Sequence, residues 1–231
     1  MSAAPDRQGR EARAAREARE ARDAVLRRIR TALADRPAAV PTPRDYERSL
    51  PPGTAIGELF VERVSDYRAT VHRTSAEGLT ATIATVVGER RAKRLAVPAG
   101  VPAGWLAGIE VERLPDDPPL SAPEIDALDG VITGCAVAIA ETGTIVLDGG
   151  PGQGRRAISL VPDYHLCVIF ERDIVGSVPE GVAKLQQVAS RPGRPITFIS
   201  GPSATSDIEL NRVEGVHGPR TLEVLVVAEA P

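Results

Sequence analysis

Apolar segments alternate with polar ones along most of this chain, and the alternation predicts a sheet flanked by helices. The expected strands are short runs rich in Val, Ile and Leu, bounded by Gly, Pro or polar residues. They span residues 67–73, 94–98, 109–114, 131–140, 144–147, 157–161, 166–170, 196–200 and 222–227. Helical crossovers early and hairpin-like strands late predict an α/β fold with a mixed sheet and helices on both faces.

Helices are expected where apolar residues recur every three or four positions. They are predicted for residues 56–63, 75–90, 102–107, 121–128 and 179–189. The start of the helix over 121–128 is the best marked, because Ser121 is followed three residues later by Glu124. This spacing is that of a capping box, in which the two residues satisfy each other's backbone N–H groups.

The first fifty residues differ in composition from the rest of the chain. Residues 7–34 are mainly Ala, Arg and Glu, which are strong helix formers. Arginines recur every third residue over 7–22, so the row drifts around a helix, and acidic residues interleave with it. Prolines between residues 37 and 52 then interrupt any helix. We therefore predict a helical arm and Pro-rich linker over 1–50 and one domain over 51–231, with the arm solvated or in contact with another subunit.

Composition and charge narrow the class of protein. The chain has 231 residues, of which 42% are hydrophobic and 26% charged, so wholesale disorder is excluded. A formal net charge of −3 gives no overall attraction to nucleic acid or to anionic membranes. The N-terminal segment lacks an apolar signal core, and no apolar run reaches the length of a membrane span. We expect a soluble, cytoplasmic protein that does not bind membranes. Nucleic-acid binding through the N-terminal arm is kept only as a third alternative, because acidic residues interrupt its row of arginines.

The cysteines and histidines do not predict a metal site. Cys135 and Cys167 each lie inside an apolar run, which predicts buried, reduced thiols on strands. The chain has no Cys-x-x-Cys pair and cannot supply the full set of thiolates for an iron–sulfur cluster. The histidines are His72, His165 and His217, without any close pair, whereas zinc sites usually show one. We interpret His72 and His165 as structural.

Glu141 is the first candidate functional residue. It ends the apolar segment 131–140, just before a turn at Gly143. A carboxylate there is costly to bury alone, so it must face a cleft or meet a donor. It is either a catalytic base, nucleophile or polar anchor, or a carboxylate that caps a nearby helix or pairs with an arginine. Thr142, Gly143 and Thr144 are candidate ligand-binding residues beside it.

A second candidate site follows the apolar segment 196–200. Its expected ligand-binding residues are Gly201, Pro202, Ser203, Thr205 and Asp207. A glycine turn after a strand, followed by hydroxyl groups at a helix start near Asp207, is a common site for a carboxylate or phosphate. Asp207 would repel such an anion unless it pairs with a cation. A plain helix-capping motif is the alternative.

His217 is the third candidate, because it lies between glycines just before the last expected strand. Its ordinary pKa of about 6.5 suits proton or hydrogen-bond donation to a ligand. Gly218 lets the backbone approach a ligand closely and is included among the candidate binding residues. The alternative is a turn histidine that bonds a backbone carbonyl.

The glycine-rich segment 149–156 resembles a phosphate loop in composition. It lacks the Gly-Lys-Ser/Thr ending of a Walker loop and does not clearly open a helix, so that type of site is excluded. We interpret the segment as a mobile hairpin loop. Its two arginines, Arg155 and Arg156, can still reach an anionic ligand or a partner.

Four segments taken together resemble the LutC/YkgG family of lactate utilization proteins. They are Ala-Glu-Thr-Gly-Thr at 140–144, Val-Pro-Asp-Tyr-His at 161–165, Gly-Pro-Ser-Ala-Thr-Ser-Asp-Ile-Glu at 201–209 and Gly-Val-His-Gly-Pro at 215–219. Their order and spacing make the resemblance specific over roughly residues 131–227. It implies a NagB/RpiA/CoA-transferase-like fold and a LUD domain over 51–231. It also implies a role in oxidising L-lactate to pyruvate beside iron–sulfur proteins.

The resemblance allows two roles for this chain. One is a non-redox subunit that binds a small carboxylate or helps assemble the iron–sulfur partners, with clusters in the partner subunits and no cofactor in this chain. The other is a free-standing enzyme of CoA-transferase-like or sugar-phosphate type, with Glu141 as nucleophile or base and His217 assisting. Both require Glu141, Thr205 and His217 to meet in one pocket at a rim of the sheet. Whether this chain is itself catalytic stays open.

Overall fold

The computed structural model of the chain describes residues 7–35, 40–189, 194–202, 204–205, 213–214 and 218–228. Its contacts divide the chain into two units, Met1–Tyr46 and Glu47–Pro231. The first unit contains the helix α1 (Arg7–Ala32), which agrees with the helix predicted there. Ion pairs one helical turn apart, such as Arg13 with Glu17, run along this helix.

The second unit contains a six-stranded sheet in the order β1-β12-β7-β4-β2-β3, and each neighbouring pair of strands is parallel. The strands are β1 (Thr70–Ser75), β12 (Thr221–Ala228), β7 (Tyr164–Phe170), β4 (Gly130–Thr133), β2 (Arg94–Ala96) and β3 (Glu112–Leu114). Inner strands of parallel sheets are covered on both faces and read as continuous apolar runs. In β12 every residue from Leu222 to Val227 is buried, and only the flanking Thr221 and Ala228 are partly exposed.

A second sheet has four strands in the order β8-β5-β6-β9. They are β8 (Ile174–Val175), β5 (Val137–Ile139), β6 (Thr144–Leu147) and β9 (Thr197–Ile199). The pair β5–β8 is parallel, whereas β5–β6 and β6–β9 are antiparallel. A small antiparallel pair joins β10 (Ala204–Thr205) to β11 (Val213–Glu214). The predicted α/β fold of mixed strand direction is therefore confirmed.

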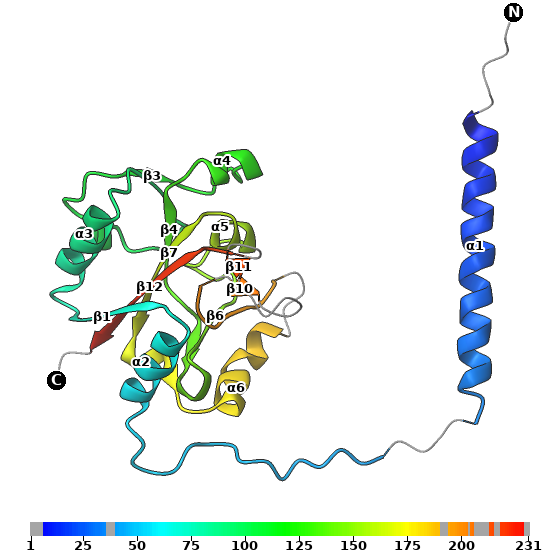
Figure 1. The fold of residues 1–231 in the computed structure, drawn as a ribbon, viewed down its shortest axis with the longest axis horizontal. Coiled ribbons are helices and arrows are strands. Elements are labelled where there is room, and N and C mark those ends of the chain that lie inside the picture. Colours follow the sequence, from blue (N-terminus) through cyan, green and yellow to red (C-terminus); the bar gives the residue numbers. More distant parts are fainter. Residues whose placement is uncertain are drawn as a thin grey trace, which may run out of the picture. The chain divides into compact units, whose positions relative to one another are not determined.

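The helices cover the sheets in layers (Figure 1). They are α2 (Ile56–Asp66), α3 (Leu79–Glu89), α4 (Ala122–Asp126), α5 (Arg156–Leu160) and α6 (Val178–Ala189), with short turns η1 (Ala103–Leu106), η2 (Ala140–Thr142) and η3 (Glu171–Asp173). Ile83 of α3 packs with Leu166 and other residues on one face of the parallel sheet. Phe60 of α2 and Ile145 of β6 pack against its other face.

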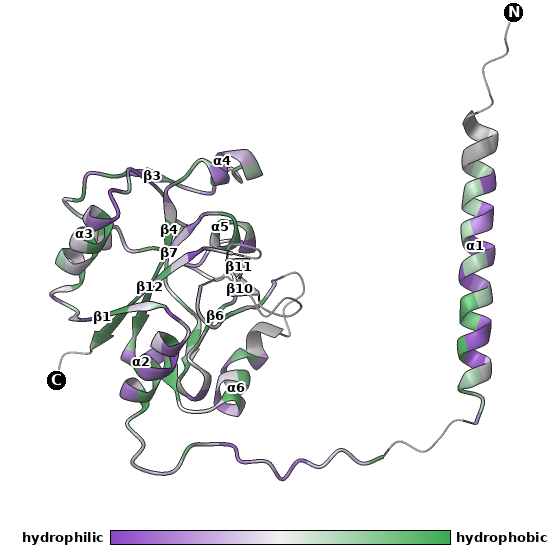
Figure 2. Ribbon diagram, in the orientation of Figure 1, coloured by the Kyte–Doolittle hydropathy of each residue, from purple (hydrophilic) through white to green (hydrophobic). Residues whose placement is uncertain are grey.

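The helix α6 covers the outer face of the four-stranded sheet, where Leu185 packs with Ile139 and Val146. Figure 2 shows that the central strands carry mainly hydrophobic residues, whereas the helices carry polar residues on their outer faces. The packing of α3 and α2 against opposite faces of the parallel sheet confirms the prediction of helices on both sides. In the part of the chain that the structure describes, no helix has the length and apolar character needed to span a membrane.

Two sequence predictions about strands were wrong. Residues 157–160 lie in the short helix α5 (Arg156–Leu160) rather than in a strand, and Val161 follows the end of that helix. Ile158 is fully buried there, in a cluster that includes Val161 and Ile125. A short apolar run fits a buried helical turn as well as a strand, so periodicity alone cannot separate them.

The predicted strand 131–140 is also divided in two, because β4 and β5 belong to different sheets. The chain crosses between the sheets at Gly134, whose N–H donates a hydrogen bond of 2.9 Å to the Gly152 carbonyl oxygen. At Ala136, the N–H donates to the Val146 carbonyl oxygen at 2.9 Å and begins the new pairing. Both strands are buried, so the apolar run continues through the crossing.

Candidate functional site

Glu141 lies in the turn η2 between β5 and β6, and its side chain is exposed. Its Oε2 accepts a hydrogen bond of 3.1 Å from the backbone N–H of Val178, the first residue of α6. The first N–H groups of a helix have no partner within the helix, and negative charge is favourable beside them. This contact corresponds to the helix-capping interpretation of Glu141, while its catalytic role stays a hypothesis.

The turn after Glu141 depends on Gly143. Its φ of 60° lies in the left-handed region that glycine tolerates best. A Cβ atom at this position would lie 2.6 Å from backbone atoms of both Arg63 and Val64 on α2. The glycine therefore lets the turn lie directly against α2, and this contact fixes the positions of the flanking residues Thr142 and Thr144.

Hydroxyl groups connect this turn to the second predicted segment. Thr142 Oγ1 and Thr144 Oγ1 share a hydrogen bond of 2.7 Å, and Thr144 Oγ1 shares another of 2.8 Å with Ser200 Oγ. The contact arises because β9 pairs antiparallel with β6, which places Ile199 opposite Ile145. Residues more than fifty positions apart in the sequence, on two of the predicted segments, thus lie side by side.

The chain turns sharply after Ser200. Gly201 has a φ of 99°, and a Cβ atom there would lie 2.6 Å from Cβ of Tyr67. A larger residue would therefore push this turn away from the segment that precedes β1. The close approach of Gly201 to Tyr67 helps to shape the cavity beside it.

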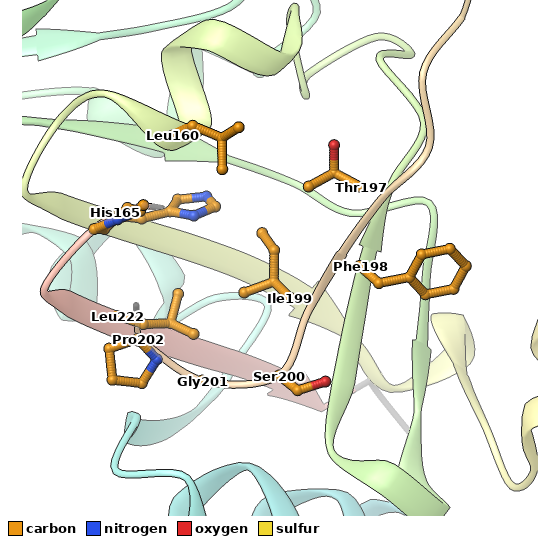
Figure 3. Close-up of a pocket in the computed structure, with 11 residues that line it drawn as sticks. Leu160, His165, Thr197, Phe198, Ile199, Ser200, Gly201, Pro202 and Leu222 are labelled. Atoms are coloured by element: carbon orange, nitrogen blue, oxygen red, sulfur yellow. The ribbon is translucent and has the colours of Figure 1, made fainter. Parts of the chain in front are cut away.

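A cavity of about 240 Å³ lies next to this turn (Figure 3). Three predicted ligand-binding residues, Gly201, Pro202 and Gly218, are in its lining. The complete lining is Leu160, His165, Thr197, Phe198, Ile199, Ser200, Gly201, Pro202, Gly218, Pro219 and Leu222. Most of these residues have apolar side chains or none, and the polar side chains of the lining are those of His165, Thr197 and Ser200.

His165 is the most deeply buried polar residue of this cavity, and Figure 3 shows its ring extending from β7 toward the cavity. Its Nε2 shares a hydrogen bond of 2.7 Å with Thr133 Oγ1, whereas Nδ1 has no partner among the described residues. Burial lowers the pKa of His165 to about 4, so the imidazole is neutral at pH 7. Depending on the tautomer, Nδ1 can donate or accept one hydrogen bond from a group in the cavity.

Sequence reasoning missed His165 as a candidate site residue, because it interpreted this residue as structural. The available signal was a pair of polar residues in strands that are otherwise apolar, Thr133 at the end of β4 and His165 near the start of β7. His72 differs, since its Nε2 lies 3.1 Å from Glu223 Oε2. Arg90 Nε also donates to Glu223 Oε1 at 2.6 Å, so that carboxylate is held between two basic residues on neighbouring elements.

The structure brings together only part of the predicted site. Gly201, Pro202 and Gly218 line one cavity, and Thr142 and Thr144 form the adjoining hydroxyl chain. Glu141 is not in the lining of that cavity.

The remaining predicted residues cannot be placed in the site. Ser203, Asp207 and His217 lie outside the described residues, and Thr205 belongs to the short strand β10. The convergence of Glu141, Thr205 and His217 on one pocket therefore stays a prediction.

An open parallel sheet joined to a smaller mixed sheet, with a ligand-sized cavity at one edge, defines the class as an α/β domain. The family profile described as LUD domain matches residues 122–227. Lactate utilization protein C of Deinococcus radiodurans is 52% identical over 200 residues, which cover 86% of this chain and 91% of that protein. Lactate utilization protein C of Halalkalibacterium halodurans is 41% identical over 101 residues, 42% of this chain and 44% of that protein.

A solved structure is similar as well. The crystal structure of a DUF162 family protein from Deinococcus radiodurans has a TM-score of 0.64 and 48% sequence identity, and the match covers 74% of this chain and 96% of that chain. The similarity in fold, the sequence identity and the share of the chain that is matched all indicate the same family. The chain belongs to the lactate utilization protein C family of LUD-domain proteins.

Proposed function

We propose that this chain serves in L-lactate utilization, as a non-redox subunit of a system that oxidises L-lactate to pyruvate beside iron–sulfur proteins. The observation that carries the proposal is the 52% identity to a protein named for lactate utilization, over 91% of that protein's length. Oxidation of lactate to pyruvate removes two electrons and two protons, one proton from the hydroxyl-bearing carbon and one from its hydroxyl group. Those electrons require a redox centre, which the proposal assigns to the partner chains.

The state of the two thiols supports this division of labour. Burial raises the pKa of Cys167 to about 12, and burial likewise raises the pKa of Cys135. Thiolates rather than thiols bind iron, so the buried Cys167 and the half-buried Cys135, both with raised pKa values, are poor cluster ligands. Two such cysteines do not make the ligand set of a cluster.

The cavity beside His165 suits a small carboxylic acid as ligand. Its volume of about 240 Å³ accommodates a molecule of a few carbon atoms, and its lining is mostly apolar. The neutral imidazole can exchange one hydrogen bond with a carboxylate or hydroxyl oxygen while an aliphatic part contacts Ile199 or Leu222. Because no buried positive charge faces this cavity from the described lining, we expect weak, reversible binding rather than tight capture.

Gene deletion tests the proposed function. A strain that lacks this chain should fail to grow on L-lactate as sole carbon source and should grow normally on pyruvate, the product of the proposed oxidation. Expression of the chain from a plasmid should restore growth on L-lactate. Growth of the deletion strain on L-lactate at the parental rate would overturn the proposal.

A further inference from the structure

The order of the parallel strands reverses next to β2. From β2 the chain moves outward to β3, and it then returns to the other side of β2 as β4. Where the order reverses, the loops after the neighbouring strands leave in opposite directions and open a crevice outside the carboxyl ends of the strands. Open α/β sheets bind their ligands in such crevices.

A cavity of about 690 Å³ lies at this point. Pro98–Gly100, which follow β2, and Pro115–Asp117, which follow β3, line one side of it. The glycine-rich loop lines the other side, at Gly149–Pro151 and Gly154. This cavity is distinct from the one at His165, which adjoins the amino ends of β7 and β12.

The glycine-rich loop is bonded to the ends of two strands. The Gly152 N–H donates to the Ala99 carbonyl oxygen at 2.8 Å, and the Gly134 N–H donates to the Gly152 carbonyl oxygen at 2.9 Å. Gly152 thus connects the segments that follow β2 and β4. The loop packs against the sheet at the crevice, where the sequence interpretation expected a mobile hairpin.

One arginine, Arg194, approaches this loop from the segment that precedes β9. The strand β9 pairs antiparallel with β6, and Thr197 lies opposite Leu147. The residues before β9 therefore run alongside the residues after β6, which include Gly150. A Cβ atom on Gly150 would lie 3.1 Å from Nη2 of Arg194. Arg194 is in the lining of the cavity and makes no ion pair with any described residue.

The carboxylates of the cavity differ in their bonding. Asp116 is fully engaged: Arg155 donates to both of its oxygens, at 2.6 and 2.9 Å, and the Leu120 N–H donates at 2.9 Å. Its neighbour Asp117 is exposed, lines the same cavity and has no bonded partner in the part of the chain described. Among the described residues, the crevice therefore presents one guanidinium, Arg194, and one carboxylate, Asp117, that make no ion pair.

We propose that this crevice binds the phosphorylated ribose of a nucleotide, with the phosphate paired to Arg194 and the ribose hydroxyls donating to Asp117. A guanidinium matches phosphate oxygens in geometry and charge. A carboxylate after the strand next to the glycine-lined crevice is where dinucleotide-binding sheets hold ribose hydroxyls. The cavity volume is in the range of sites that enclose ligands of this size. This inference goes beyond the proposed function, since lactate carries neither group.

Calorimetric titration of the purified full chain tests the inference, with ADP, ribose 5-phosphate, pyrophosphate and L-lactate as probes. ADP should bind more tightly than pyrophosphate, because the ribose adds its contact with Asp117. Arg194→Gln should weaken ADP binding about tenfold, the effect of a lost charge-assisted hydrogen bond. Asp117→Asn should weaken the binding of ADP, whereas the affinity for pyrophosphate should change by less than about twofold. Ribose 5-phosphate matching ADP would identify a sugar phosphate as the source, and a clear preference for ADP would identify a nucleotide.

A second variant and a control keep the test decisive. Ala99 is exposed in the lining, so Ala99→Trp should fill the cavity and abolish ADP binding while Arg194 remains. Arg28→Gln on the exposed surface of α1 removes a charge elsewhere and should leave binding unchanged. ADP binding no tighter than that of pyrophosphate, or unchanged by both Arg194→Gln and Ala99→Trp, would overturn the inference. These results are independent of growth on L-lactate, so failure here leaves the proposed function standing.

Discussion

His165 is fully buried, and its Nδ1 has no hydrogen-bond partner in the part of the chain that the structure describes. The burial makes its protonation, and hence the stability of the fold, sensitive to pH. Its pKa is about 4 in the folded chain and 6.5 when unfolded, so the unfolded state binds more protons between these values. The stability that depends on a neutral His165 is fully present above pH 6.5. It is lost progressively as the pH falls from 6.5 to about 4. Between these limits the free energy of unfolding should fall by about 3 kcal/mol on account of this residue.

Urea unfolding of the wild type and of His165→Asn across that pH range measures this contribution. The asparagine does not titrate, so the variant should lose less stability on acidification than the wild type. Equal losses in the two proteins would show that another group dominates and that His165 is not held neutral by its surroundings.

Two glycines with different surroundings form a matched pair for a second prediction. Gly143→Ala should lower the free energy of unfolding by roughly 2–4 kcal/mol, because the new Cβ meets the backbone of α2 at a left-handed φ. Gly88 lies in α3 with nothing within 4 Å of a Cβ atom. Gly88→Ala should therefore raise stability by up to about 1 kcal/mol through helix propensity. Thermal unfolding that ranks these variants in the reverse order would contradict the packing described for Gly143.

At the residue scale the sequence showed where chain turns occur, but not which partners polar groups meet. Gly143 and Gly201 were found because a glycine after an apolar run marks a turn. The contact of Glu141 with α6 and the contact of His165 with Thr133 join segments far apart in the chain. Such contacts depend on how the sheets pack against each other, and a local sequence pattern does not predict that packing.

At the element scale, the start of α6 offers a test of Glu141. Glu141→Gln keeps a hydrogen-bond acceptor but removes the charge beside the helix N-terminus, and it should lower the free energy of unfolding by less than about 1 kcal/mol. Growth on L-lactate should remain normal if the carboxylate only caps the helix. Loss of growth with an unchanged melting temperature would instead establish Glu141 as a functional group. Glu110→Gln, at an exposed glutamate of a loop, serves as the control.

Element types were predictable where a strong local signal existed. The capping box at Ser121 was correct: Glu124 Oε2 accepts from the Ser121 N–H at 2.7 Å. The run 144–147 coincides with β6. The errors at 157–161 and 131–140 share one cause. Burial keeps a segment apolar whether it is a strand, a helical turn or a crossing between sheets, so hydropathy does not distinguish them.

At the scale of the whole molecule, the boundary between arm and domain can be tested by truncation. All of the described core residues belong to the unit Glu47–Pro231. A chain that begins at Glu47 should therefore melt within about 2 °C of the full chain in differential scanning calorimetry. A large drop in melting temperature would show that the first unit contributes to the stability of the second.

The fold separates two cavities along the parallel strands. The His165 cavity adjoins the amino ends of β7 and β12, whereas the larger cavity adjoins the carboxyl ends of β2 and β3. The sequence predicted a site at one rim of the sheet from its glycine and hydroxyl motifs. The larger cavity could not be predicted in this way, because it depends on the strand order and on the pairing of β6 with β9.

We propose that this chain works with iron–sulfur partners in the oxidation of L-lactate. Affinity purification of the tagged chain from its native cells during growth on L-lactate, followed by measurement of iron and identification of the accompanying chains, tests it most directly. We predict that iron and cysteine-rich partner proteins elute with the chain, whereas the chain purified alone carries no cluster. Elution of the chain alone and free of iron, from cells that are oxidising L-lactate, would contradict the account.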